Sequence, residues 1–103
     1  LASRFQVKCV YTHEAVVDLE RIRIFLIEHY SESYSSIIEE LIERVAKLEE
    51  FPRLGSRLVS SPIALELREI VIGSYVVRYL ILDQTVSILR VWYGKEDRSG
   101  IES

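Results

Sequence analysis

The sequence contains little of what stabilises or anchors many small specialised proteins. Its 103 residues include one cysteine, no methionine, one tryptophan, two prolines and four glycines. The single cysteine, Cys9, excludes a disulfide framework and a zinc site built from cysteines alone. No apolar run exceeds four residues, well short of the ~18 needed for a membrane-spanning helix. We expect no signal peptide at the start of the chain, and these absences together favour a cytoplasmic protein.

Positive charge is also scarce. Thirteen basic residues stand against 16 acidic ones, which gives a net charge of -3 at pH 7. This balance argues against a general nucleic-acid binder. The acidic residues are concentrated in one segment, because residues 14–50 carry ten acids and four bases. Residues 51–103 carry seven bases and six acids, so the second half of the chain is mildly basic.

Apolar residues are plentiful, at 49% of the chain, and predict one folded domain over residues 1–103. Residues 5–11 are rich in Val, Phe and Tyr and predict a strand, and Thr12 is suited to cap a helix that follows. Apolar residues spaced three and four apart then predict two helices, which a serine-rich segment separates. Pro52 ends the second helix, so we expect a helical hairpin. The two predicted apolar stripes are Ala15, Leu19, Ile22, Leu26, Tyr30 and Tyr34, Ile37, Ile38, Leu41, Ile42, Val45, Leu48, Phe51.

The second half of the chain predicts three strands after a loop at residues 51–57. The strands cover residues 65–72, 75–82 and 85–93, and two-residue gaps separate them. Gaps of this length are hairpin turns, so the three strands form an antiparallel meander. The first strand is expected at the sheet edge, because a lone strand cannot satisfy its backbone. The fold class is α+β, with the order β-α-α-β-β-β and an antiparallel sheet packed against the helical hairpin.

Four segments in this order resemble one family. They are residues 11–19 (YTHEAVVDL), 52–55 (PRLG), 67–79 (LREIVIGSYVVRY) and 86–98 (VSILRVWYGKEDR). Together they resemble the RelE/ParE superfamily of bacterial toxins from type II toxin–antitoxin modules. The resemblance implies one of two activities: RelE-like members cleave mRNA on the ribosome, and ParE-like members poison DNA gyrase. It also implies a cognate antitoxin whose C-terminal segment wraps the toxin.

The RelE-like alternative needs a catalytic set. Metal-free RNA cleavage requires a base, cations for the developing phosphorane and an acid for the leaving oxygen. The resemblance implies an arginine where Val76 stands, although Arg78 shares its face of the strand. No tyrosine follows residue 94, and acidic residues in the tail disfavour RNA binding. The catalytic candidates under this alternative are Arg78, Tyr93, Lys95 and Arg98.

The ParE-like interpretation needs only a binding surface and is favoured. Arg68 and Arg90 are assigned to the face that binds the target. The alternative to target binding is that these arginines and Arg78 only form surface ion pairs with Glu66, Glu69 or Asp97. Strand aromatics that could stack on bases are more often packed in the sheet. They are Tyr75, Tyr79, Trp92 and Tyr93.

The sequence therefore predicts a growth-inhibiting toxin of the plasmid-stabilising kind, acting on DNA gyrase and neutralised by a cognate antitoxin. The alternatives are a ribosome-dependent mRNA endonuclease and a non-toxic member that only binds its antitoxin. No cofactor is expected, and no metal, because His13 and His29 lack partners at ligand spacing. We expect an apolar groove along the helices and sheet for the antitoxin, and a possible homodimer through the same surface.

Overall fold

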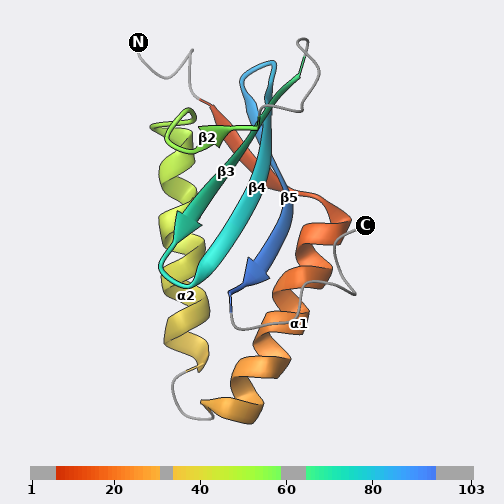
Figure 1. The fold of residues 1–103 in the computed structure, drawn as a ribbon, viewed down its shortest axis with the longest axis vertical. Coiled ribbons are helices and arrows are strands. Elements are labelled where there is room, and N and C mark those ends of the chain that lie inside the picture. The colour runs from red at the N-terminus through yellow and green to blue at the C-terminus, as the bar shows by residue number, and fades with distance from the viewer. Residues whose placement is uncertain (1–6, 31–33, 59–64, 95–103) are drawn as a thin grey trace.

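The computed structural model describes residues 7–30, 34–58 and 65–94. The predicted order of helices and strands is confirmed (Figure 1). A two-residue strand, β2, is added within the segment predicted as loop, and a short 3₁₀ helix, η2, follows the second helix. The elements are β1 (Lys8–Tyr11), α1 (His13–His29), α2 (Tyr34–Val45), η2 (Ala46–Glu49), β2 (Ser56–Arg57), β3 (Glu66–Ile72), β4 (Tyr75–Leu82) and β5 (Thr85–Tyr93).

The five strands form one sheet in the order β1-β5-β4-β3-β2. β3, β4 and β5 form the predicted antiparallel meander, and β1 lies at the edge as expected, parallel to β5. Gly73 has a φ of 61° in the first hairpin turn, a left-handed value that glycine tolerates. Asp83 and Gln84 have φ values of 51° and 62°, as a type I′ hairpin turn requires.

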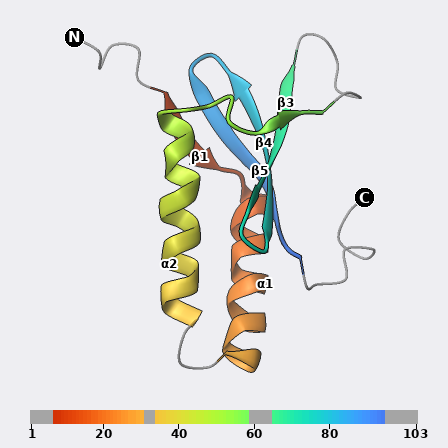
Figure 2. The ribbon, with the colours of Figure 1, turned by 60° about the vertical axis from the view of Figure 1, so that its left-hand side comes forward.

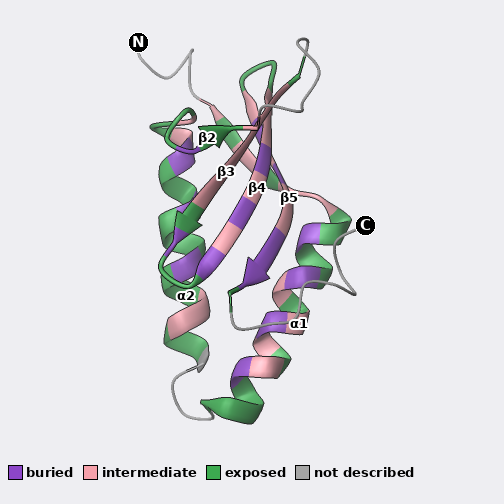
Figure 3. Cartoon of the chain, in the orientation of Figure 1, coloured by how far each residue is buried: buried purple, intermediate pink, exposed green. Residues whose placement is uncertain are grey.

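The two helices run antiparallel beside each other and cover one face of the sheet (Figures 1 and 2). Burial alternates along β4, so one side of the strand faces the core and the other turns away from the helices (Figure 3). Among the described residues, no helix is long and apolar enough to cross a membrane. The best-buried core residues are Ala15, Ile22, Leu26, Leu41, Val45, Leu48, Val77, Tyr79, Val86, Ile88 and Val91.

Two members of the predicted second stripe are not in the core. Ile42 is 42% exposed and Phe51 is 56% exposed, so placing them on the buried side was wrong. Ile42 lies about 100° around the helix from Leu41, at the margin of the buried arc. The chain then tightens into η2, which has about three residues per turn and moves the later positions out of phase with α2.

β5 contains a β-bulge, which lies just after the part of the strand that pairs with β1. Arg78 pairs with Arg90 and Tyr79 with Ile88, so Leu89 is an extra residue in β5. The predicted helix cap lies beside this bulge: the Thr12 hydroxyl accepts a hydrogen bond from the Ala15 N–H at 3.2 Å. It also donates toward the Ile88 and Leu89 carbonyls, at 3.0 and 3.2 Å. Thr12 therefore ties the start of α1 to the bulge.

Candidate functional site

The face of the sheet turned away from the helices, here called the open face, carries a stacked cationic cluster. Arg78 and Val76 from β4 and Arg90 and Trp92 from β5 share this face by strand alternation and register. The Arg78 guanidinium lies 4.9 Å from the centre of the Trp92 ring and the Arg90 guanidinium lies 5.6 Å from it. Arg78 also donates to the Glu69 carboxylate at 2.8 Å. Two cations on one indole form a favourable stacking arrangement.

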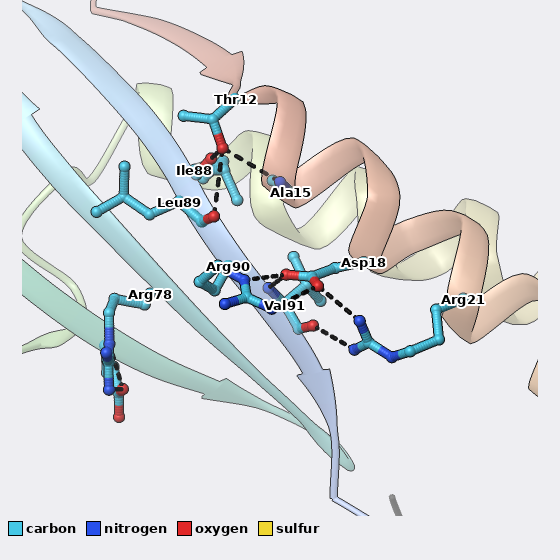
Figure 4. A network of polar contacts seen from close by, with 10 residues as sticks. Thr12, Ala15, Asp18, Arg21, Arg78, Ile88, Leu89, Arg90 and Val91 are labelled. Atoms are coloured by element: carbon cyan, nitrogen blue, oxygen red, sulfur yellow. Dashed lines mark hydrogen bonds and ion pairs between the residues drawn. The ribbon is translucent and has the colours of Figure 1, made fainter. Parts of the chain in front are cut away.

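Arg90 is held by a buried carboxylate from α1. Asp18 is 1% exposed and accepts from the Arg90 Nε and Nη2 at 2.8 and 3.0 Å (Figure 4). It also accepts from Arg21 Nη1 at 2.6 Å and from the Val91 N–H at 2.8 Å. Burial alone would raise the pKa of Asp18, but the hydrogen bonds from Arg90, Arg21 and Val91 outweigh it, and the net pKa is lowered. Asp18 is therefore an ionised, fully engaged buried carboxylate.

Asp18 and Arg21 also complete an edge of the sheet. β1 pairs with β5 only as far as the match of Tyr11 with Ile88. Beyond the bulge, the Val91 N–H donates to Asp18 and the Val91 carbonyl accepts from Arg21 Nη2 at 3.1 Å. Two side chains of α1 thus satisfy backbone groups that a neighbouring strand would otherwise bond.

Asp18 is a residue that the sequence analysis missed, since it assigned Asp18 no role. A usable signal was present. Asp18 follows Ala15 by three positions and precedes Ile22 by four, which places it on the buried arc of α1. A charge at such a position needs a buried partner, and a basic residue on a strand was the natural candidate.

Tyr93 lies on the other face of the sheet from Arg78. It pairs with Tyr75, is 6% exposed, and packs its ring 5.2 Å from that of Phe25. Burial, together with a hydrogen bond to Tyr30, raises the pKa of Tyr93, which keeps its hydroxyl protonated. The structure does not bring Arg78 and Tyr93 together into one catalytic site.

Arg68 also faces the helix side and anchors a loop. Its guanidinium pairs with Glu66 at 2.9 Å and donates to the Gly55 carbonyl. Glu66 also accepts from Arg53 at 2.8 Å, and the hydrogen bonds from Arg53 and Arg68 lower the pKa of Glu66. Close by, the Tyr79 hydroxyl accepts from the Gly55 N–H at 2.8 Å. A Cβ at Gly55 would lie only 2.6 Å from the Glu69 carbonyl oxygen, so glycine is required there.

The ion-pair interpretation is confirmed for two of the arginines. Arg68 pairs with Glu66 and Arg78 with Glu69, while Arg90 pairs instead with Asp18. The strand aromatics are buried, as the packing interpretation expected. Lys95 and Arg98 lie outside the described residues and stay predictions.

The described part of the chain contains no cluster of three His, Cys, Asp or Glu residues that could hold a metal ion. Cys9 is partly buried in β1, and its backbone N–H donates to Glu49 at 2.9 Å. Burial and the nearby Glu49 carboxylate raise the pKa of the Cys9 thiol to about 11. The thiol is neutral near pH 7, so Cys9 is not an activated nucleophile.

The fold places a helical hairpin under a β3-β4-β5 meander, with β1 parallel to β5 at the edge of the sheet. Residues 9–98 match the family described as the ParE toxin of the type II toxin–antitoxin system parDE. The chain belongs to the ParE toxin family. The resemblance to the RelE/ParE superfamily is therefore confirmed, and the chain is a ParE-family toxin of a type II toxin–antitoxin system.

Solved structures share the ParE-family fold. A chain of the chromosomal ParDE toxin–antitoxin system from P. aeruginosa superposes with a TM-score of 0.69 at 16% identity, covering 86% of this chain and 97% of that one. A chain of the RelBE2 toxin–antitoxin complex from Mycobacterium tuberculosis gives a TM-score of 0.63 at 23% identity, covering 85% and 91%. At these identities the likeness establishes the fold alone. No curated protein matches the sequence.

In this ParE-family chain the arginines Arg68, Arg78 and Arg90 of β3, β4 and β5 are engaged in ion pairs. Arg78 and Arg90 gather on the open face over Trp92, and Arg68 and Tyr93 lie on the helix side. The open face therefore presents two guanidiniums that are stacked on a buried indole, without an assembled acid–base pair among the described residues. This arrangement suits recognition of a partner better than proton transfer.

Proposed function

We propose that this ParE-family toxin acts on DNA gyrase in the bacterial cytoplasm and is neutralised by a cognate antitoxin. The observation that supports a binding mechanism is the separation of the candidate catalytic residues. Arg78 lies on the open face and Tyr93 is buried on the opposite face, with its hydroxyl kept protonated. RNA cleavage at one site would need these groups to converge on one phosphate.

The proposed target-binding surface is centred on Arg78 and Arg90. Both guanidiniums are oriented by carboxylates, Glu69 and Asp18, and both lie over Trp92. Cations fixed in this way lose little rotamer freedom when a partner binds, which favours affinity. Arg68 faces the helix side, so its assignment to the same surface loses support. Lys95 and Arg98 follow β5 in the sequence and remain candidates for extending the surface.

An antitoxin partner is supported by family membership and by the solved toxin–antitoxin complexes that share the fold. The chain also leaves large apolar side chains exposed that a partner segment can cover. Val71 on β3 is 70% exposed, and Leu54 in the loop before β2 is 60% exposed. A segment that buries such residues gains roughly 25 cal/mol for each Å² of apolar surface removed from water.

The test is a gyrase supercoiling assay with the purified chain, run beside a ribosome-dependent mRNA cleavage assay. We expect inhibition of supercoiling, no mRNA cleavage, and growth arrest with filamentation on expression in cells. Relaxation by topoisomerase I is the control for non-specific effects on DNA. Cleavage of mRNA with gyrase unaffected would favour the endonuclease, and normal growth at high expression would favour a non-toxic antitoxin-binding member.

Two arginine variants test whether the open face is the surface that binds gyrase. Arg78→Gln removes a cation from the open face, and we expect its potency against gyrase to fall at least ~10-fold, as for loss of a central charged contact. Arg57→Gln removes an exposed arginine of β2 as the matched control and should retain potency. If both variants inhibit gyrase equally, the open face is not the surface that binds the target.

A further inference from the structure

The two helices differ in what they present to solvent. The exposed side of α2 carries mainly charge, including Glu39, Glu40 and Glu43. The exposed side of α1 also carries charges, such as Glu14 and Glu28, but it includes three large apolar residues as well: Val17, Ile24 and Ile27 are 50%, 48% and 36% exposed. α1 therefore has an apolar strip on its outer side as well as its core-facing stripe. A helix that is apolar on both sides is usually buried on both.

The outer strip has the spacing of a coiled-coil seam. Val17, Glu20, Ile24 and Ile27 follow one another at steps of three, four and three residues. These steps place all four side chains within a narrow arc of the helix, opposite the buried arc that contains Ile22. Glu20 is the one charged residue in the seam. A single polar residue at a seam position is the usual device that fixes the register and orientation of paired helices.

Glu20 and Arg23, the charged residues near the middle of the seam, can pair with the same two residues of a second copy. Arg23 flanks the seam and pairs with Glu20 of the same helix, with its Nε 3.1 Å from Oε2. If two copies of α1 lie antiparallel, Val17 of each packs against Ile27 of the other. Glu20 then lies beside Ile24 of the other copy, next to that copy's Arg23. The two Glu20–Arg23 pairs can therefore be exchanged across the two-fold axis.

We propose that α1 is a homodimer interface, in which two copies of this chain pair antiparallel through the seam of Val17, Glu20, Ile24 and Ile27. A parallel pair would place like charges against each other at Glu20 and Arg23, which disfavours that orientation. One helix–helix contact buries less than the ~1,200 Å² of a standard interface, so the dimer is weak and concentration-dependent. The proposal depends on neither gyrase nor an antitoxin.

The first test is sedimentation equilibrium of the full chain from about 10 µM to about 1 mM, the range expected for a small interface. We expect a monomer–dimer equilibrium. Ile24→Glu should raise the dissociation constant at least ~10-fold, because it places an unpaired charge in the seam. Ile42→Glu is the matched control, since Ile42 is an isoleucine of similar exposure, 42%, on α2. A chain that stays monomeric at the highest concentration, or equal effects of the two variants, would overturn the proposal.

Charge variants on the exposed surface test the pairing without disturbing the core. Glu20→Arg alone and Arg23→Glu alone should each self-associate at least ~5-fold more weakly, because like charges then meet across the axis. An equimolar mixture of these two variants should associate more tightly than either alone. The double variant carrying both changes should recover the wild-type dissociation constant. A mixture that associates no better than its components would contradict reciprocal Glu20–Arg23 pairing and with it the proposed antiparallel dimer.

Discussion

The two halves of the outer edge of β5 are completed in different ways. From Thr85 to Ile88 the edge bonds to the backbone of β1, and beyond the bulge at Leu89 it bonds to side chains of α1. The backbone half depends on strand pairing, which many residue types support. The side-chain half depends on two charged residues, Asp18 and Arg21. A helix can therefore take over the hydrogen-bonding role of an absent strand when it places a charged pair beside the strand's backbone N–H and carbonyl.

The largest loss of stability should come from removing Asp18, whose side chain bonds to the half of the β5 edge beyond the bulge. Asp18→Ala leaves Arg90 without its carboxylate and the Val91 N–H without an acceptor. We expect a loss of about 3 kcal/mol in the free energy of unfolding, at the lower end for a broken buried pair, since the Arg21 and Arg90 side chains are 28% and 24% exposed. Urea denaturation measures it. Glu20→Ala, which breaks an exposed pair on the same helix, is the control, and an equal loss in both variants would show that Asp18 contributes no more than a surface charge.

A smaller effect should appear on acidification. The pKa of Asp18 is lowered in the folded state below its ordinary value, so the contribution of Asp18 to stability is complete above the unfolded-state pKa. That contribution is lost as the pH falls through the folded-state pKa. The stability difference between the wild type and Asp18→Asn should therefore shrink as the pH is lowered from 6 to 3. Urea midpoints at both pH values measure this difference, and a difference that does not change with pH would mean that the pKa of Asp18 is the same in the folded and the unfolded chain.

A mutation of Thr12, which bonds to the bulge between the two halves of the edge, should lower the stability of the chain by an intermediate amount. Thr12→Ala removes the helix cap and the bond to the bulge carbonyls, and we expect a loss of about 1 to 2 kcal/mol in unfolding free energy. Thr12→Ser keeps the hydroxyl and should retain most of the stability in the same denaturation experiment. If the serine variant is as unstable as the alanine variant, the methyl group of Thr12 matters more than its hydrogen bonds.

The smallest effect is expected on the far side of β1, where Glu49 accepts the Cys9 N–H. Water can replace this acceptor at a partly exposed edge, so Glu49→Gln should change stability by less than about 0.5 kcal/mol. Removing the charge should lower the pKa of the Cys9 thiol from its value of about 11, because burial and the Glu49 carboxylate raise it. Titration of the thiolate absorbance measures the shift, and an unchanged pKa would assign the elevation to burial alone.

Most of the fold could be predicted because it follows from local patterns. The period-two strands, the two-residue gaps at Gly73 and Asp83, and the apolar spacing of α1 each specify their element without long-range information. β2 was not predicted because a strand of two residues is too short to show an alternation of apolar and polar residues. It forms only because Ser56 and Arg57 meet the edge of β3, a contact distant in sequence. The out-of-phase position of Phe51 likewise depends on η2, which the apolar spacing did not reveal.

The candidate site was less predictable, because its geometry depends on strand register. Alternation correctly placed Arg78 on the same face as Val76. It could not predict which residues of β5 lie opposite those of β4, because the bulge at Leu89 shifts the register. Arg90 could be assigned to a surface, yet its partner Asp18 lies 72 positions away. Ion pairs between distant elements need the tertiary fold, whereas Glu66 and Arg68 lie two positions apart on one strand, and Glu66 was among the partners that the sequence suggested for the arginines.

Trp92 is the only tryptophan of the chain and lies under two guanidiniums on the open face. Its indole is therefore the one tryptophan fluorophore of the chain, and it is buried beneath two arginines of the proposed target-binding surface. The emission maximum of a buried indole shifts when nearby charges move, so displacement of Arg78 or Arg90 has an optical signature. Events on the outer side of α1 lie across the sheet from this ring and should leave its emission unchanged. The molecule thus carries its own spectroscopic label, which can distinguish occupancy of the open face from self-association.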